Sequence, residues 1–385
     1  MKKEKLLPSL FICFLFIFLS IFYPSLLFAQ KPATTNTDYC HFVGTINGNL
    51  SIVMDLVQNG NMYSGSYYYT KYNIPINLEG KVNNKGEIEL FTMDENGEKV
   101  EFITGNINQD TFVGNWKNKD QTKKLSISLV EDYSKSIAFT FTSIQDSVKL
   151  LKNRKDTPQA RFSDVIVEVK QVPQGSNLSK IKELLKKYQS IQDSESSSAN
   201  QSARQVVENN KNSFFKEYLE VNKDQDEDYL YAANWVNESD IEVVFNDHYF
   251  ATLSFSNYMY MGGAHGMYGE SYLVIDTKSG KEIKLNDIFD KQSLTTLEKR
   301  MIKKAYAYTG FENPVSLQDA GYLVDKIEVT DNFSLTAKGI TFVYQPYEIA
   351  PYAAGMPAFL FTWEELKDLI KTDSSVRSLL KITVK

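Results

Sequence analysis

Between Cys40 and Glu131 the sequence repeats short runs in which apolar and polar residues alternate, and several runs end at an asparagine–glycine turn signal. Residues 50–56 precede Asn59-Gly60, and residues 100–103 follow Asn96-Gly97. Alternation with a period of two predicts strands with one buried face, and Asn-Gly favours tight hairpins. This stretch is therefore predicted to fold as an antiparallel meander.

Glycines recur in the middle of these predicted strands. Residues 43–46, 78–82 and 103–107 each contain one, and residues 63–67 and 112–116 place a glycine between two aromatic residues. A mid-strand glycine is typical of a bulge or a sharp bend in a closing sheet. We therefore expect a strongly curved sheet or a small up-and-down barrel. Its interior is filled by its own side chains or holds a ligand, and the sequence leaves both open.

The pattern changes after residue 135. Strand-like runs follow, among them residues 249–255, which alternate strictly, and they are interrupted by segments with helical spacing. The expected helices are residues 179–193, 206–221, 293–308 and 363–370, the last opened by a capping box of Thr362 and Glu365. The predicted class is α+β, with C-terminal antiparallel sheets and packed helices preceded by an N-terminal all-β meander or small barrel. The expected domains are residues 38–135, 136–258 and 259–385, with 136–385 forming one compact unit.

Residues 1–30 have the organisation of a signal peptide. Lys2, Lys3 and Lys5 precede an almost wholly apolar stretch that ends near Ala29. We expect cleavage there and an extracytoplasmic bacterial protein with no membrane span afterwards, although an apolar run of this length also suits a retained anchor. The polar residues 31–37 are expected to form a flexible leader.

The charge balance narrows the choice of partner. The formal net charge is −6, and it becomes −8 once the three N-terminal lysines and Glu4 are removed. No basic stripe occurs, so nucleic acid is excluded as a partner. An acidic surface attracts a basic protein or peptide, and it equally serves to keep an exported protein soluble.

Few residues are suited to catalysis. The chain has three histidines (His41, His248 and His265), and Cys40 is the single cysteine after cleavage, which excludes an intrachain disulfide and a cysteine metal cluster. There is no P-loop, no pair of histidines spaced for zinc, and no complete nucleophile elbow. We therefore predict no catalytic residue, no metal site and no cofactor, while a pair of carboxylates far apart in sequence remains open.

Two phrases carry the candidate site. The first is Tyr260-Met-Gly-Gly-Ala-His-Gly266, and the second is Tyr344-Gln-Pro-Tyr-Glu-Ile-Ala-Pro-Tyr-Ala-Ala-Gly355. Tyrosines on rigid loops are good contact residues, and glycines permit backbone conformations closed to other residues. The ligand-binding candidates are Tyr260, His265, Tyr268, Tyr347 and Tyr352. The structural candidates are Gly262, Gly263, Gly266, Pro346, Pro351 and Gly355. Each aromatic candidate has the alternative role of packing over the sheet, and His265 that of locking the turn.

These phrases, with residues 284–289, resemble the paired signatures of the secreted module found in RsiV-type, lysozyme-sensing anti-sigma factors and at the front of some peptidoglycan deacetylases. The resemblance covers roughly residues 137–369 and does not include the N-terminal β region. It implies a binding domain and a lysozyme-like partner, in a chain without the regulatory half of an anti-sigma factor and without a deacetylase catalytic domain.

Three hypotheses for function follow. The first is an exported cell-envelope protein that binds a protein or a cell-wall glycan without catalysis. The second is an envelope hydrolase that uses a carboxylate pair or His265, and the third is a carrier of a small ligand in the N-terminal barrel. The oligomeric state and the ligand are not determined by the sequence.

Overall fold

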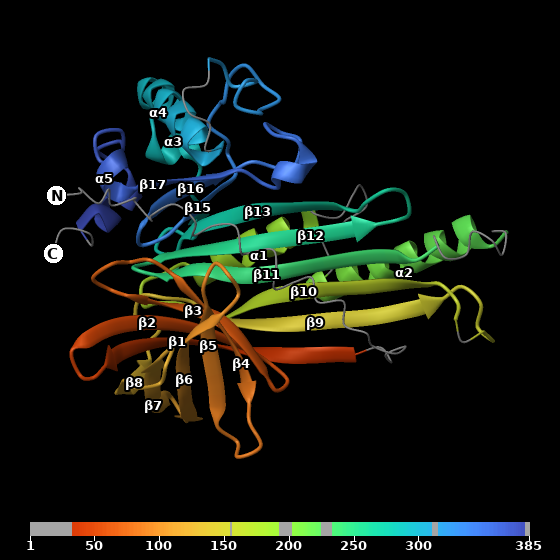
Figure 1. Cartoon of the computed structure of the whole chain (residues 1–385), viewed down its shortest axis with the longest axis horizontal. Coiled ribbons are helices and arrows are strands. Elements are labelled where there is room, and N and C mark those ends of the chain that lie inside the picture. Colours follow the sequence, from red (N-terminus) through yellow and green to blue (C-terminus); the bar gives the residue numbers. More distant parts are fainter. Residues whose placement is uncertain (1–32, 155, 192–201, 225–232, 310–314, 382–385) are drawn as a thin grey trace, which may run out of the picture.

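The structure is a computed structural model that describes residues 33–154, 156–191, 202–224, 233–309 and 315–381. The predicted signal peptide, residues 1–30, lies outside this range. Among the residues described, no helix combines the length and the apolar character that a membrane crossing requires. The fold is α+β: an eight-stranded antiparallel barrel precedes sheets that are packed with helices (Figure 1).

The barrel is an up-and-down meander in which each strand pairs with the next. Its first and last strands also pair, from Phe42↔Glu131 to Ile46↔Ile127, and this closes the sheet. Closure leaves no free edge along these strands. The strands are β1 (Ala33–Ile46), β2 (Leu50–Asn59), β3 (Met62–Tyr69), β4 (Ile76–Val82), β5 (Ile88–Met93), β6 (Lys99–Asn108), β7 (Thr111–Asn118) and β8 (Lys124–Glu131).

The mid-strand glycines allow neighbouring strands to approach closely where the barrel bends. A Cβ atom on Gly80 would lie 2.1 Å from the backbone oxygen of Glu89, and one on Gly65 would lie 2.0 Å from that of Asp55. No side chain fits at such distances, so these positions require glycine. Inside the barrel, apolar side chains such as Phe42, Met54 and Phe112 are fully buried and fill the interior.

A second set of strands continues the barrel sheet. The first half of β1 pairs with β9 (Ala138–Lys149), so this one strand belongs to both parts. The order then runs β9-β10-β11-β12-β13-β14. The remaining bounds are β10 (Gln159–Gln171), β11 (Trp235–Asp247), β12 (Phe250–Tyr260), β13 (Met267–Asp276) and β14 (Lys281–Glu282).

One pair departs from the antiparallel order: β10 and β11 are parallel. Parallel neighbours require a crossover connection, and helices α1 (Leu178–Ile191) and α2 (Ala203–Asn222) lie between these strands in the chain. Both helices lie behind the sheet in Figure 1. Ile181 and Leu185 of α1 pack on Leu253 and Leu273, whereas Phe214 and Tyr218 of α2 pack on the other end of the sheet.

The C-terminal part adds a separate three-stranded sheet and short helices. Strand β15 contacts β11, β12 and β13, and Thr252 donates a hydrogen bond of 2.7 Å to the carbonyl of Leu335. The elements are α3 (Leu285–Ile288), α4 (Lys291–Thr309), β15 (Phe333–Leu335), β16 (Gly339–Val343), the 3₁₀ helix η2 (Tyr352–Ala354), β17 (Ala358–Thr362), α5 (Trp363–Leu366) and the 3₁₀ helix η3 (Ser375–Lys381).

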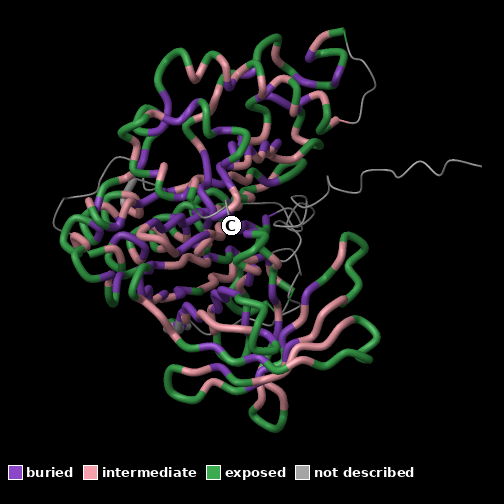
Figure 2. Tube along the Cα trace, turned by 90° about the vertical axis from the view of Figure 1, so that its left-hand side faces the viewer, coloured by how far each residue is buried: buried purple, intermediate pink, exposed green. Residues whose placement is uncertain are grey.

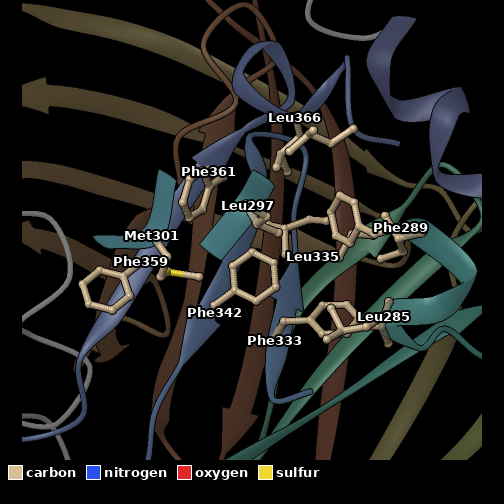
Figure 3. Close-up of a cluster of buried hydrophobic side chains, with 14 of the residues drawn as sticks. Leu285, Phe289, Leu297, Met301, Phe333, Leu335, Phe342, Phe359, Phe361 and Leu366 are labelled. Atoms are coloured by element: carbon tan, nitrogen blue, oxygen red, sulfur yellow. The ribbon is translucent and has the colours of Figure 1, made fainter. Parts of the chain in front are cut away.

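An apolar core joins these elements. Figure 3 shows Leu297 and Met301 of α4 against Phe342 and Phe361 of the small sheet. Val53 and Tyr68 on the outside of the barrel belong to the same core. Figure 2 shows buried positions running through the middle of the molecule, while the loop tips of the barrel are exposed.

Two local expectations were wrong. Residues 31–37 are not a free leader over their described part, because Thr34–Thr37 pair with β9. The helix expected over 363–370 begins at the predicted capping box but ends at Leu366, since Ile370 turns back to form a bridge with Phe289. Both differences arise from pairing with residues far away in sequence.

Candidate functional site

The first phrase forms the turn between β12 and β13. The last cross-strand pair is Met259↔Met267, and Gly262 and Gly263 turn the chain with φ angles of 97° and 94°. Side chains rarely adopt such angles, so the glycines are required here. Glycine is required at position 266 for a different reason, because a Cβ atom there would lie 2.5 Å from the ring of Tyr258.

The second phrase is a loop that is anchored at both ends. Tyr344 is buried and donates a hydrogen bond of 2.6 Å to the carbonyl of Glu328. Pro351 precedes the single turn of η2, and Gly355 ends it with a φ of 73°. Pro346 is half-buried at the other end of the loop. Proline restricts the backbone and glycine supplies the left-handed cap, so this loop is stiff.

The two phrases meet, although about 80 residues separate them in sequence. The hydroxyl of Tyr352 donates a hydrogen bond of 2.8 Å to the carbonyl of Gly266. The ring of Tyr352 stacks on His265 at 4.2 Å between centroids, meets Tyr268 edge-on at 5.2 Å, and lies 5.6 Å from Tyr347. We call His265, Tyr268, Tyr347 and Tyr352 the aromatic cluster.

Two residues of the aromatic cluster are exposed to solvent, and the other two are half-buried. His265 is exposed and half of the Tyr347 side chain is accessible to solvent, whereas Tyr268 and Tyr352 are half-buried. Tyr347 also has a φ of 67°, in the left-handed region that is costly for an aromatic residue. A strained backbone that holds an exposed ring outward is a frequent property of ligand contacts.

Tyr260, the fifth predicted contact residue, has a different position. Its hydroxyl donates a hydrogen bond of 3.0 Å to the carbonyl of Gly263, which closes the turn on itself. The ring of His265 is likewise within 2.9 Å of the carbonyl of Gly266. The structure therefore brings four of the five candidates together, and it gives Tyr260 and His265 contacts that hold the turn.

Two amide side chains that the sequence analysis did not single out join the C-terminal part to β13. Gln345 donates to the carbonyl of Glu270 at 2.6 Å and accepts from its backbone N–H at 3.2 Å. Asn332 accepts from the N–H of Tyr272 at 3.1 Å and donates to the Glu270 carbonyl at 2.9 Å. Together these amides replace a neighbouring strand at the edge of the sheet. Gln345 lies within the second phrase, but no local pattern marks it.

Carboxyl groups lie on the same face of the sheet as the cluster. Ile241, Leu253 and Leu273 point to α1, so their neighbours point the other way. The register aligns Asp240, Ser256 and Glu270 across three strands, and the next row contains Glu242, Ser254 and Tyr272. One step further towards the hairpin tip, Tyr258 pairs with Tyr268 of the cluster. We call Asp240, Glu242 and Glu270 the carboxyl stripe.

The surrounding protein favours the neutral forms of these carboxyl groups. Burial raises the pKa of Asp240 to about 6, and burial with the charges of Asp240 and Glu270 raises the pKa of Glu242 to about 8. Burial also raises the pKa of Glu270, against hydrogen bonds from Tyr272 and Ser254. Glu242 is nevertheless an exposed residue by its solvent accessibility, so burial alone does not account for the shift, and the neighbouring charges of Asp240 and Glu270 contribute to it. A carboxyl group that is accessible and desolvated at once is a frequent property of functional sites.

No group of three or more histidine, cysteine or acidic side chains suited to a metal ion occurs in the part of the chain that the structure describes.

Comparison with known proteins gives two family matches. Residues 286–364 match the family described as a protein of unknown function, DUF3298, and residues 163–268 match the family described as deacetylase PdaC. The first phrase lies within the PdaC match and the second within the DUF3298 match. The hydrogen bond from Tyr352 to Gly266 therefore connects the two matched segments.

One solved structure has a similar fold over about two thirds of the chain. A DUF3298 family member from Bacteroides fragilis NCTC 9343 is 20% identical, with a TM-score of 0.56 over 65% of this chain and 100% of the other. A DUF3298 family protein from Pseudomonas aeruginosa PAO1 is 15% identical, with a TM-score of 0.44 over 63% of this chain and 97% of the other. No curated protein matches the chain. The chain is thus similar to PdaC in its central segment and to DUF3298 proteins in its C-terminal segment.

Proposed function

We propose that this protein is an extracytoplasmic binding protein that recognises a protein or a cell-wall glycan through the aromatic cluster and does not transform it. The observation that carries the proposal is the meeting of His265, Tyr347 and Tyr352 on a stiff, hydrogen-bonded loop pair with two of the rings exposed. Rigid aromatic side chains lose little entropy on binding, and they contribute strongly to interfaces.

The location and the nature of the partner rest on further arguments. The lysines and the apolar stretch of residues 1–30 favour export, and the PdaC match agrees with a place in the cell envelope. The formal net charge of the chain is negative. This charge favours a partner with a basic surface, such as the lysozyme-like protein that the resemblance to RsiV-type ectodomains implies.

The test is a direct binding measurement with two probes, purified lysozyme and soluble peptidoglycan fragments, against the mature chain. We expect one probe to bind and Tyr347→Ala to weaken that binding at least tenfold, as is typical of an interface anchor. Tyr72→Ala is the matched control, because Tyr72 is a tyrosine of similar exposure on the barrel. Absence of binding to both probes, or an equal loss in the two variants, contradicts the proposal.

A hydrolase is the second candidate, favoured by one observation, the raised pKa of the solvent-accessible Glu242 beside Asp240. A carboxyl group that stays protonated near neutral pH is suited to act as a general acid. Incubation of the mature chain with peptidoglycan, with product release followed over time, tests this candidate. Release that is lost in Glu242→Gln favours the hydrolase, whereas binding without release favours the binding protein.

A further inference from the structure

A buried polar network lies where the barrel meets the second part of the sheet. His41 and Asp55 are a cross-strand pair on the outer face of the barrel, with 2.7 Å between Nδ1 and the carboxylate. Tyr39 donates a hydrogen bond of 2.5 Å to the same carboxylate oxygen. All three residues are at least 90% buried. Removing one partner of a buried ion pair of this kind destabilises the folded state, because the remaining charge is left buried without a counter-charge.

Asn246 of β11 connects this network to the second part of the molecule. Its amide donates to the hydroxyl of Tyr39 at 2.7 Å and to the carbonyl of Ile137 at 2.7 Å. The amide oxygen accepts the backbone N–H of Ile137 at 2.8 Å, directly before β9 begins. The chain of contacts therefore runs from β2 through β1 to β11 and β9, across the junction.

Other groups surround His41 at the same junction. The hydroxyl of Tyr133 accepts the backbone N–H of His41 and donates to the carbonyl of Tyr39. Asp247, next to Asn246, accepts a hydrogen bond of 3.3 Å from Tyr68 of the barrel and pairs with His248 at 2.9 Å. The charges that act on His41 are thus those of Asp55, Asp247 and Asp132, and the phenols of Tyr39 and Tyr133 share its contacts. Asp247 in turn contacts His248 and Tyr68.

The electrostatics of this environment favour a charged His41. Burial by itself lowers the pKa of this histidine, but the carboxylates of Asp55, Asp247 and Asp132 outweigh burial and raise it. Burial also acts against ionisation of Asp247, while His248 and the charge of His41 lower the pKa of that carboxyl. Loss of the proton from His41 therefore leaves Asp55 beside a neutral ring in a buried site.

We propose that this network is a pH-sensitive coupling between the barrel and the rest of the molecule. Protonated His41 holds Asp55, and Asp55 orients Tyr39 as the partner of Asn246. When His41 loses its proton, the buried carboxylate loses its counter-charge, and the contact between Tyr39 and Asn246 weakens with it.

The direction with pH follows from the raised pKa of His41. The contribution of the pair is complete below the unfolded-state pKa of about 6.5 and is lost as pH rises through the folded-state value. Alkaline pH should therefore loosen the junction before it affects the interior of the barrel.

The first measurement needs no variant. The chain contains three histidines, so the ring protons of the mature protein give a simple NMR titration. We expect the signal of His41 to titrate above about 6.5, the ordinary value for histidine. Over the same pH range the hydrogen-exchange protection factor of the Ile137 amide should fall at least tenfold. The Ile103 amide, deep in the barrel, serves as the internal control and should keep its protection factor.

Variants assign the effect to the proposed residue. His41→Gln should lower the Ile137 protection factor already at low pH and remove its dependence on pH. His265→Gln, a change at an exposed histidine of the hairpin turn, should keep the wild-type pH profile. If His41→Gln does not fold, the NMR titration of His41 and the hydrogen exchange of the Ile137 amide in the wild-type protein test the proposal by themselves. Titration of His41 at or below about 6.5, or an Ile137 amide that does not follow it, overturns the proposal.

Discussion

The side-chain amide of Gln345 hydrogen-bonds to both backbone groups of Glu270, donating to the carbonyl at 2.6 Å and accepting from the N–H at 3.2 Å. This is the pattern by which a neighbouring strand pairs, here supplied by one side chain. Gly269 leaves the required room, because a Cβ atom there would lie 2.9 Å from the amide oxygen of Gln345. The contact places the aromatic loop over the edge of β13.

Gln345→Ala should destabilise the protein by about 1–3 kcal/mol, because two backbone groups of a largely buried residue lose their partner. Denaturant unfolding of the mature chain measures this free energy. Gln318→Ala is the control, since Gln318 is exposed, and its effect should stay within about 0.5 kcal/mol. An equal effect of the two substitutions contradicts the role assigned to Gln345.

Tyr347→Gly should separate stability from binding. The left-handed backbone of Tyr347 costs about 1–2 kcal/mol in a residue with a side chain, and glycine removes that cost while it adds unfolded-state entropy. The free energy of unfolding should therefore stay within about 1 kcal/mol of wild type. The affinity for whichever probe binds the wild-type protein, lysozyme or peptidoglycan fragments, should fall at least tenfold.

Tyr344→Ala provides the contrast within the same loop. Tyr344 is buried, and its truncation should cost about 3–5 kcal/mol by analogy with other large aromatic truncations. If Tyr347→Gly is as destabilising as Tyr344→Ala, then Tyr347 has a packing role and is not a contact residue.

Glu242→Gln should change how stability depends on pH. The folded-state pKa of Glu242 is about 8, above its unfolded value, so the native state prefers the proton, and stability falls as pH rises through this range. The variant should melt at a higher temperature than wild type at about pH 9 and at nearly the same temperature at about pH 4. Glu183→Gln on the exposed side of α1 should show no such difference. A parallel pH profile for wild type and Glu242→Gln would show that the carboxyl group ionises normally.

Gly80→Ala should weaken the barrel. The added Cβ atom would lie 2.1 Å from the backbone oxygen of Glu89, so β4 and β5 have to separate, at a cost of about 1–3 kcal/mol. The loss should appear as lower hydrogen-exchange protection in β4 and β5, with β12 and β13 little affected. Unchanged protection in β4 and β5 would mean that the close approach of these strands is not required.

Local features of the chain were largely predictable. The turns at Asn59-Gly60 and Asn96-Gly97, the barrel-type curvature marked by Gly65 and Gly80, and the capping box at Thr362 all follow from short-range preferences. The two phrases were also found from sequence, and the structure brings their side chains into one cluster. Short-range preferences failed where distant partners decide the outcome, as at residues 31–37 and at the end of α5.

The amino-acid sequence by itself determined the α+β class, the meander of the N-terminal part and the residue types of the candidate site, because alternation, turn residues and capping act over a few positions. Only the tertiary structure decided the parallel pairing of β10 with β11, the edge contact of Gln345 and the carboxyl stripe. The physical reason is that strand order and register set which distant residues become neighbours. The desolvation and the neighbouring carboxyl charges that raise the pKa of Glu242 exist only once those neighbours are in place.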